Sequence, residues 1–314
     1  MNNMTDKIAG IHHITAIAGN AKRNMDFYTR VLGLRMVKRT VNFDDPGTYH
    51  FYYGNETGMP GTILTFFPWE GIAGGRAGTG MATDIGYSVS KDSLPFWAER
   101  FRELRVSHGA PEERMGEVYL PFRDPDGLNI SLVGSNDVDD RKPWSTPEVP
   151  PTEATKGFHS VTLTLREMGP TAAVLTDVFG YRLERQEGNR YRFRTDAVPA
   201  AAIVDLVEAP KEGRGLNGGG TNHHVAFRVA NEEMQMSFRE KILSRGLHIT
   251  PKINRDYFFS VYFREPGGVL FELATDNPGF TVDEPLDQLG MHLKLPVQYE
   301  SMRKEIERSL PALS

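Results

Sequence analysis

Short apolar strands and single amphipathic helices alternate along the chain in an order that recurs. The segment "GIHHITAIAGN" (10–20) reads as a strand, and a helix is predicted after it because apolar residues recur at helical spacing before Gly33: Met25, Tyr28, Val31 and Leu32. Three strand-like segments follow between Gly, Asn and Pro residues: "RMVKRTVNF", "TYHFYYGN" and "TILTFFPW". The pattern predicts a β-α-β-β-β unit.

The same order of elements recurs three more times, in copies that open with "TDIGYSV", "FHSVTLTL" and "NHHVAFRV". Aligning the four opening strands places His13, Asp84, Ser160 and His224 in one register, with spacings of 71, 76 and 64 residues. A repeat of about seventy residues therefore fills most of the chain. The sequence predicts an α+β fold of four βαβββ modules.

An acidic and then proline-rich segment, "NDVDDRKPWSTPEVPPTEATK", separates modules one and two from modules three and four, as a linker between two halves would. We therefore predict a first half over 8–134, a linker over 135–156, a second half over 157–280 and a tail over 281–314. The tail contains a predicted helix, "QYESMRKEIERSL", which either docks on the body or covers a site as a lid.

Composition narrows the classes of function. The formal net charge is −5, which leaves no basic stripe of the kind that binds nucleic-acid phosphates. The chain has no cysteine, so any metal must be held by His, Asp or Glu. Neither a secretion signal in "MNNMTDKIAG" nor a run of roughly 18 apolar residues is found. We expect a cytoplasmic protein that acts on a small molecule and has neither a nucleic-acid nor a membrane partner. The sequence does not decide whether it forms a homo-oligomer.

Two pairs of adjacent histidines begin the first strands of modules one and four: His12 with His13, and His223 with His224. Alternate residues of a strand face opposite sides, so only one histidine of each pair can face the open side of the sheet. In module four the apolar phase that packs under the helix consists of Val225, Phe227 and Val229. This phase leaves His224 on the open, cup-like side, and the same count selects His13.

A carboxylate enters the same cup from the last strand, because Phe271 and Leu273 belong to the apolar phase and Glu272 does not. Two imidazoles and one carboxylate form the facial triad that suits non-haem Fe(II) and leaves positions open for substrate and O₂. Each residue alone is more often a capping, core or solvated residue. The shared register favours the metal site, because the equivalent positions of modules three and two hold Ser160 and Ser131.

His13 lies in module one, and His224 and Glu272 lie in module four. Because all three would bind one metal, these two modules must lie side by side. We expect modules one and four to pair into one cup-shaped half-barrel that holds the metal. Modules two and three would pair into a second, empty half-barrel.

The fourfold pattern, with a histidine on the first strand and "EPGGVLFE" placing Glu272 four residues after Gly268, resembles the vicinal oxygen chelate superfamily, which includes glyoxalases, bleomycin resistance proteins and extradiol dioxygenases. Within it the sequence is similar to the hydroquinone ring-cleaving dioxygenase branch, over nearly the whole chain. The resemblance implies extradiol-type cleavage of a small hydroquinone-like aromatic by O₂, with Fe(II) held by His13, His224 and Glu272.

The resemblance also assigns residues around the metal: Arg255, Tyr262, His223 and His12 to catalysis and Thr15 to the substrate. Arg255 would stabilise developing negative charge, and Tyr262, His223 or His12 would relay protons. A role for either of these histidines requires a twist or bulge at the strand start; otherwise both anchor the ligands from behind. The remaining histidines are expected to be structural or solvated: His50, His108, His159, His248 and His292.

Two other classes of function use this scaffold. A glyoxalase-type metal-dependent lyase or isomerase, or a thiol transferase, normally places a second carboxylate in the cup, but Thr65 fills that register. A metal-free binding module, as in drug-sequestering resistance proteins, has no need of three ligand-type residues. The iron content of the purified protein separates that last class from the enzymes.

Overall fold

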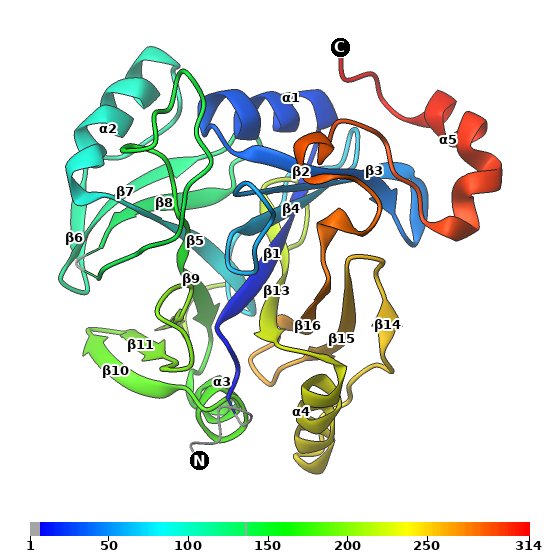
Figure 1. The fold of residues 1–314 in the computed structure, drawn as a ribbon. Helices are drawn as coiled ribbons and strands as arrows, with labels where there is room; N and C mark the ends of the chain where they lie inside the picture. The colour runs from blue at the N-terminus through cyan, green and yellow to red at the C-terminus, as the bar shows by residue number, and fades with distance from the viewer. Residues whose placement is uncertain (1–6, 136) are drawn as a thin grey trace.

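Two eight-stranded sheets carry the four modules in the computed structural model, which describes residues 7–135 and 137–314 (Figure 1). Residues 1–6, where we expected no secretion signal, lie outside the described residues, as does residue 136 of the predicted linker. In spatial order, the first sheet consists of β14 (Ile253–Asn254), β15 (Phe258–Arg264), β16 (Leu270–Pro278), β13 (Thr221–Val229), β1 (Ile11–Ala18), β4 (Ile63–Pro68), β3 (Asp45–Gly54) and β2 (Arg35–Asn42). This sheet contains modules four and one.

The second sheet contains modules three and two. In spatial order it consists of β10 (Arg182–Glu187), β11 (Arg190–Arg194), β12 (Ile203–Glu208), β9 (Gly157–Leu165), β5 (Met81–Val89), β8 (Asn129–Gly134), β7 (Glu117–Arg123) and β6 (Glu112–Arg114). Antiparallel pairing of the opening strands, β1 with β13 and β5 with β9, joins the two modules of each sheet. The predicted fold class and the pairing of modules one with four and two with three are confirmed.

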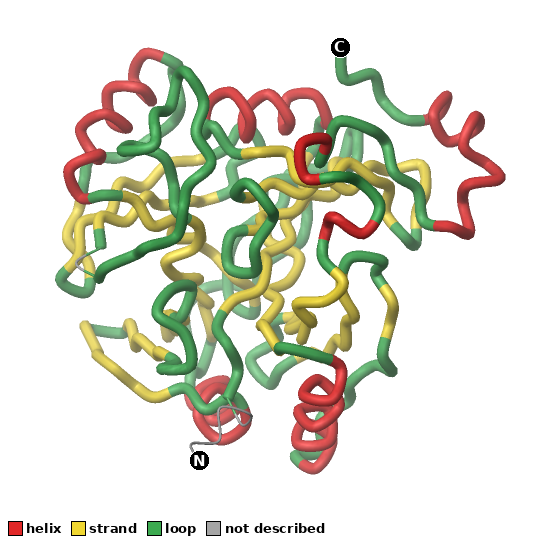
Figure 2. The backbone as a smooth tube through the Cα atoms, in the orientation of Figure 1, coloured by secondary structure: helices red, strands yellow, loops and turns green. Residues whose placement is uncertain are grey.

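Each opening strand leads into a helical segment that packs on its sheet (Figures 1 and 2). These segments are α1 (Ala21–Asp26) with the π-helical η2 (Phe27–Val31), η3 (Lys91–Ser93) with α2 (Leu94–Glu103), α3 (Gly169–Ala173) with η4 (Val174–Val178), and α4 (Glu232–Ser244). The side chains of Asn20 and Asn231 accept backbone N–H groups at the starts of α1 and α4, which fixes where these helices begin.

The core lies between the helices and the sheets. Val225, Phe227 and Val229 are fully buried, as the apolar phase of β13 predicts. Phe227 packs against Phe271 of β16 with ring centroids 4.8 Å apart, and both rings join the cluster that contains Phe238 of α4. Burying this phase against the helix fixes the opposite phase of β13 and β16 toward the concave side of the sheet.

The tail docks along β2 and β3, and its elements are η5 (Phe280–Val282), η6 (Leu286–Gln288), η7 (Val297–Met302) and α5 (Arg303–Ser309) (Figure 1). The buried amine of Lys38 on β2 donates to Asp283 Oδ1 and Glu284 Oε2, each at 2.5 Å. The hydroxyl of Tyr299 donates to the carbonyl of Phe43 at 2.8 Å. Of the two alternatives left open by the sequence, the structure therefore shows docking.

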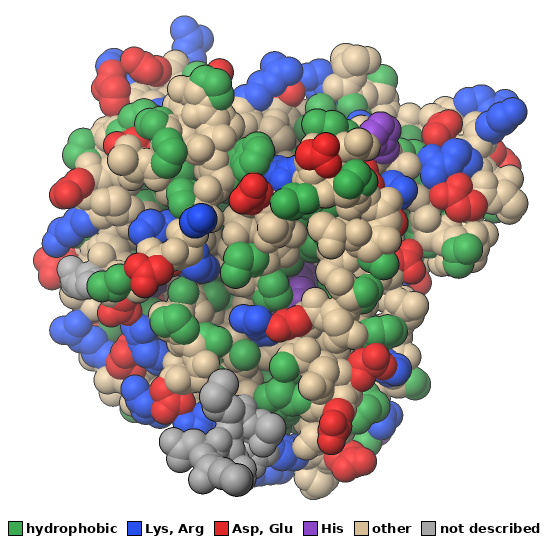
Figure 3. Space-filling view, viewed as in Figure 1, with side chains coloured by type: hydrophobic (Ala, Val, Ile, Leu, Met, Phe, Trp, Pro, Cys, Tyr) green, Lys and Arg blue, Asp and Glu red, His purple; other side chains and the backbone are tan. Residues whose placement is uncertain are grey.

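Charged side chains of both signs are mixed over the face of the molecule in Figure 3, so this face shows no field of one sign. In the described part of the chain, no helix combines the length and the apolar character needed to cross a membrane.

Candidate metal centre

Three buried side chains from three neighbouring strands meet on the concave side of the first sheet: His13 of β1, His224 of β13 and Glu272 of β16. Their nearest nitrogen and oxygen atoms all lie within 4.8 Å of one another. Glu272 Oε2 is 3.2 Å from His13 Nε2 and 2.9 Å from His224 Nε2. Among the described residues, this is the one group of three or more His, Cys, Asp or Glu side chains placed to hold a metal ion.

Unpaired atoms at this point show that the three side chains suit a cation. His224 Nε2 and Glu272 Oε2 are buried and have no hydrogen-bond partner, although they lie close together. Buried polar atoms without partners are costly, and a bound cation would satisfy both. Burial lowers the pKa of His224, which favours the neutral imidazole that ligates metals.

The neighbouring histidine fixes which nitrogen of His13 faces this point. His12 Nε2 lies 3.1 Å from the carbonyl oxygen of Thr275, which can only accept, so His12 carries its proton on Nε2. Burial lowers the pKa of His12 well below its ordinary value, so the ring is neutral and its Nδ1 accepts. His13 Nδ1, 2.9 Å away, must then donate to His12. The lone pair of a neutral His13 therefore lies on Nε2, which faces Glu272.

Two β-bulges bring the histidine pairs together. In the β1–β13 ladder, Ile11 pairs with Phe227 but His13 pairs with the adjacent Ala226, so His12 is the extra residue. A second shift leaves His223 as the extra residue on β13. His223 Nδ1 lies 2.8 Å from His224 Nδ1, as in the first pair. The strict alternation assumed from the sequence is wrong at these two positions, and the bulge that a role for both residues requires is present.

The remaining contact of Glu272 comes from the adjacent strand β15. Ser260 donates its hydroxyl proton to Glu272 Oε1 at 2.5 Å and leaves Oε2 directed at the two imidazoles. Ser260 is fully buried, and sequence reasoning did not find it. Its position two residues before Tyr262, on the same face of the strand, is the signal that could have identified it.

A cavity of about 360 Å³ adjoins the three side chains. Its apolar walls include Phe67, Trp69 and Phe258, and its polar walls include Thr15, Arg255 and Tyr262. This volume lies near the lower end of the range for small-molecule pockets, which suits a ligand with a single ring. No residue of the tail lines the cavity.

Arg255 and Tyr262, which the family resemblance assigns to the site, lie together at the cavity wall. The guanidinium of Arg255 lies 5.6 Å from the centre of the Tyr262 ring and 3.5 Å from a carboxylate oxygen of Asp44, which also lines the cavity. The ring of Tyr262 contacts that of His224 edge-on at 5.7 Å. Burial raises the pKa of Tyr262 well above its ordinary value, so its phenol stays protonated and can donate a proton or hydrogen bond.

A chain of hydrogen bonds reaches the cavity through a histidine that we expected to be structural or solvated. Tyr52 OH lies 2.9 Å from His50 Nδ1, and His50 Nε2 lies 2.9 Å from Thr65 Oγ1. Thr65 Oγ1 lies 2.9 Å from Thr15 Oγ1. His50 is buried and lines the cavity. The two-residue spacing of His50 and Tyr52, opposite Thr65 on β4, could have indicated that they share the concave face.

Comparison with known proteins gives a family and close relatives. The description "Glyoxalase/Bleomycin resistance protein/Dioxygenase superfamily" matches residues 10–132 and 157–273. A Bacillus subtilis protein provisionally named ring-cleaving dioxygenase MhqO is 45% identical, covering 98% of this chain and 97% of that protein. The chlorohydroquinone/hydroquinone 1,2-dioxygenase of Sphingobium indicum is 33% identical, covering 99% and 98%. A crystal structure of a provisionally named B. subtilis dioxygenase matches with a TM-score of 0.94 and 44% identity, covering 98% of both chains.

Proposed function

Because this chain belongs to the glyoxalase/bleomycin resistance protein/dioxygenase superfamily, we propose that it is an Fe(II)-dependent enzyme that cleaves the ring of a hydroquinone-like aromatic with O₂. One observation carries the proposal. Two buried imidazole nitrogens and one buried carboxylate oxygen converge beside an aromatic-walled cavity, and two of these atoms, His224 Nε2 and Glu272 Oε2, have no hydrogen-bond partner. This donor set is typical of non-haem Fe(II) oxygenases.

His13, His224 and Glu272 would hold the iron, and Thr15 would contact the substrate. When bound, Fe(II) supplies a Lewis acid that lowers the pKa of a phenolic hydroxyl and a redox centre for O₂. His12, His223 and Ser260 would hold the three ligands in place from behind, through the contacts at Nδ1 and Oε1 described above.

Arg255 and Tyr262 would act on the substrate itself. The guanidinium of Arg255 adds a fixed positive charge at the cavity wall, which stabilises an ionised ring hydroxyl and the negative charge that develops on oxygen during cleavage. Tyr262 holds a proton at its hydroxyl, and this proton can be donated to a ring oxygen. His223 also lines the cavity and is a second candidate for proton transfer, whereas His12 does not line it.

The aromatic walls would orient the ring and exclude water. Phe258 lies 4.8 Å from the ring of the proposed ligand His13, and Phe67 lies 5.9 Å from the ring of His223, the neighbour of the proposed ligand His224. A planar substrate between such walls is held by stacking and burial of its apolar faces. These walls favour an aromatic substrate over a glutathione adduct, whose peptide is polar.

No observation favours the glyoxalase-type reaction. On β4, Thr65 pairs with Thr15 of β1. On β16, Glu272 pairs with Ala226 of β13 in the equivalent register. Thr65 therefore occupies the position where a second carboxylate would enter the cup. Thr65 is instead bonded to Thr15 and His50. A metal-free binding module leaves the unpaired atoms of His224 and Glu272 unexplained.

Oxygen uptake tests the proposal. The purified protein would be loaded anaerobically with Fe(II) and mixed with O₂ and a panel of hydroquinones, catechols and the methylglyoxal–glutathione adduct. We expect hydroquinones to consume O₂ and to lose the ring absorbance in equal amounts. Isomerisation of the adduct without O₂ uptake, or no reaction with any aromatic diol, would contradict the proposal.

A further inference from the structure

The second sheet forms a cup whose positions correspond one by one to those of the metal cup. Ser131 pairs with Gly86 of β5 as Glu272 pairs with Ala226 of β13, so Ser131 takes the place of the carboxylate. By the same register, Asp84 and Ser160 take the places of His224 and His13. This cup therefore lacks the two imidazoles of the first.

An arginine balances the buried acids of the second cup. Arg192 donates to both oxygens of Asp205 at 2.9 and 3.0 Å, to Glu117 at 2.6 Å and to the hydroxyl of Tyr119 at 2.7 Å. Its side chain is only 3% exposed. Arg192 thus gives both carboxylates a cationic partner, and neither needs a metal for this purpose.

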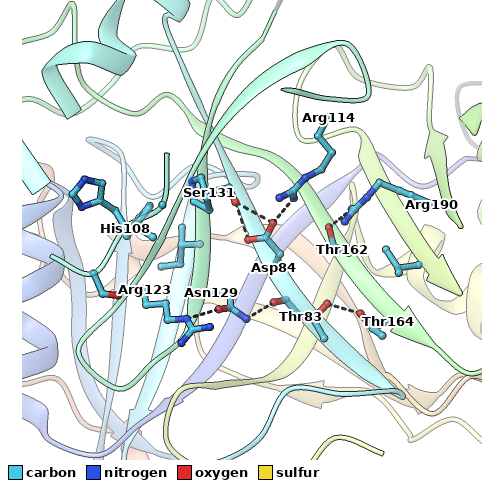
Figure 4. Close-up of a pocket in the computed structure, with 16 residues that line it drawn as sticks. Thr83, Asp84, His108, Arg114, Arg123, Asn129, Ser131, Thr162, Thr164 and Arg190 are labelled. Atoms are coloured by element: carbon cyan, nitrogen blue, oxygen red, sulfur yellow. Dashed lines mark hydrogen bonds and ion pairs between the residues drawn. The ribbon is translucent and has the colours of Figure 1, made fainter. Parts of the chain in front are cut away.

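The second cup nevertheless keeps an open cavity, of about 480 Å³, which is the one drawn in Figure 4. Its walls correspond to those of the first cavity: Thr162 lies two residues after Ser160 as Thr15 lies two after His13, and Thr83 precedes Asp84 as His223 precedes His224. Val207 stands where Phe67 would be. Polar and charged side chains make up most of the lining, and Phe122 is its one phenyl ring.

Two arginines of this cavity occupy positions equivalent to those of site residues in the first. Arg114 precedes Pro121 by seven residues, and Pro121 pairs with Ser131 as Tyr262 pairs with Glu272, so Arg114 corresponds to Arg255. Arg192 pairs with Asp205 as Tyr52 pairs with Thr65, so Arg190, two residues earlier, corresponds to His50. The second cup therefore has an arginine at the position of Arg255 and a further arginine at the position of His50, whereas it lacks the two histidines and the glutamate of the metal cup.

The charges that line the cavity are predominantly positive. Three arginines line it, Arg114, Arg123 and Arg190, against one carboxylate, Asp84. Asp84 accepts hydrogen bonds from Ser131 and Arg114 and is thus already paired (Figure 4). Arg114 is also paired with Glu112, which lies outside the cavity lining.

Arg190 and Arg123 each use only some of their N–H groups in hydrogen bonds within the described part of the chain. Arg190 uses Nη1 for Thr162 at 3.0 Å and, more weakly, for Asp205 at 3.5 Å, and Asp205 is already held by Arg192. Its Nε and Nη2 have no partner among the described residues. Arg123 uses Nε for Asn129 at 3.1 Å. Figure 4 draws these two arginines on opposite sides of the cavity, with Asp84, Asn129 and Thr83 between them and Thr162 beside Arg190.

We propose that the second cup is a metal-independent binding site for a small dicarboxylate, with one carboxylate held by Arg190 and the other by Arg123. Planar guanidinium groups bind carboxylates through paired hydrogen bonds, and two of them on opposite walls select an anion at each end. The hydroxyls of Thr83, Thr162 and Thr164 line the same cavity; Thr83 and Thr164 bond to each other at 2.7 Å, and Thr162 accepts from Arg190. This proposal does not depend on ring cleavage in the first cup.

Calorimetric titration of the iron-loaded full chain with succinate tests the proposal at low ionic strength. We expect one saturable site per chain and no binding of 1,4-butanediol, which has the length of succinate without its charges. Arg190→Gln should weaken succinate binding at least tenfold, or about 1.4 kcal/mol. Arg123→Gln, at an exposed position, should weaken it severalfold and provides a second variant if Arg190→Gln folds poorly.

Two control variants locate the site. Arg182→Gln changes an exposed arginine of β10 that does not line the cavity, so it should leave succinate binding unchanged. Glu272→Gln alters the metal cup alone and should also leave it unchanged. The proposal is overturned if wild-type protein gives no saturable heat tighter than roughly 10 mM. It is equally overturned if binding survives both second-cup substitutions and disappears in Glu272→Gln.

Discussion

A single backbone carbonyl, that of Thr275, orients the proposed metal ligands at the residue scale. It fixes the proton of His12 on Nε2, and His12 in turn fixes the proton of His13 on Nδ1. The sequence reveals the histidine pair but not this chain of hydrogen bonds, because Thr275 lies 263 residues from His12. The convergence of His13, His224 and Glu272 was thus predictable from residue type and strand phase, whereas the groups that orient these side chains were not.

Removing the negative charge of Glu272 should release the metal without unfolding the protein. Glu272→Gln keeps the size of the side chain and an oxygen for Ser260, but it no longer offsets the charge of Fe(II). We expect iron affinity to fall by more than the roughly 10–100-fold that loss of a supporting residue costs, with turnover falling in parallel. Iron per chain by elemental analysis and the thermal unfolding midpoint measure the two effects.

Ser131→Ala is the matched control for this substitution, because Ser131 holds the equivalent position of the second cup. It should keep full iron and full oxygen uptake. Full iron and activity in Glu272→Gln would remove Glu272 from the metal site.

Tyr262 should matter for turnover and not for iron. Tyr262→Phe keeps the ring that packs on His224 and deletes only the hydroxyl that holds the proton. Loss of a general acid or base typically costs about 10²–10⁴-fold in rate. We therefore expect normal iron content with kcat reduced within that range, measured by oxygen uptake at saturating hydroquinone. Iron loss together with the rate would assign Tyr262 to the metal site instead.

At the scale of elements, the strands and helices follow from periodicity, but the bulges do not. Alternation along β1 and β13 gave the correct phase for His13 and His224, because Val225 and Phe227 had to be buried. It gave the wrong orientation for His12 and His223, because a bulge depends on the register between two strands more than two hundred residues apart. The second sheet has the same shifts, at Thr83 and His159, so the bulges belong to the scaffold and not to the metal site.

The ionic cluster that joins β7, β11 and β12 should make stability depend on acid pH. Burial alone would raise the pKa of Glu117, but hydrogen bonds from His159 and Arg192 outweigh burial and lower the pKa to about 2. An unfolded glutamate titrates near pH 4.3, as a rough reference. The folded state therefore binds fewer protons between these values, so the stabilisation is complete above pH 4.3 and is lost as the pH falls toward 2.

Glu117→Gln tests this pH dependence by urea unfolding at pH 6, 4 and 3. Wild type should be more stable than the variant at pH 6, and the difference should shrink as the pH falls through 4 to 3. Glu113→Gln, at an exposed glutamate of β6, is the control and should behave as wild type at each pH. A difference between wild type and Glu117→Gln that stays constant from pH 6 to 3 would contradict the assigned cause.

At the scale of the whole molecule, the pairing of distant modules was predictable because the ligand types are distributed unevenly. His13 lies in module one and His224 with Glu272 in module four, and three ligands need one site. What fills the second cup was not predictable, because Arg192 reaches Glu117 across 75 residues of sequence and no motif marks the pair. Docking was one of two alternatives for the tail, but the contacts that hold it were not predictable, since nothing in the sequence indicates that Lys38 is buried against Asp283 and Glu284.

The two ends of the chain should therefore control iron binding, and the middle should not. His13 pairs with Ala226 beside His224, although the two histidines are 211 residues apart in sequence. Ser160 holds the corresponding place in the second sheet, where its hydroxyl contacts His159 at 3.0 Å. We expect His13→Ala to abolish iron binding and oxygen uptake and Ser160→Ala to leave both almost unchanged, with similar unfolding midpoints for the two variants. If iron persisted in His13→Ala and were lost in Ser160→Ala, the metal would lie in the second cup, and the proposed site would be wrong.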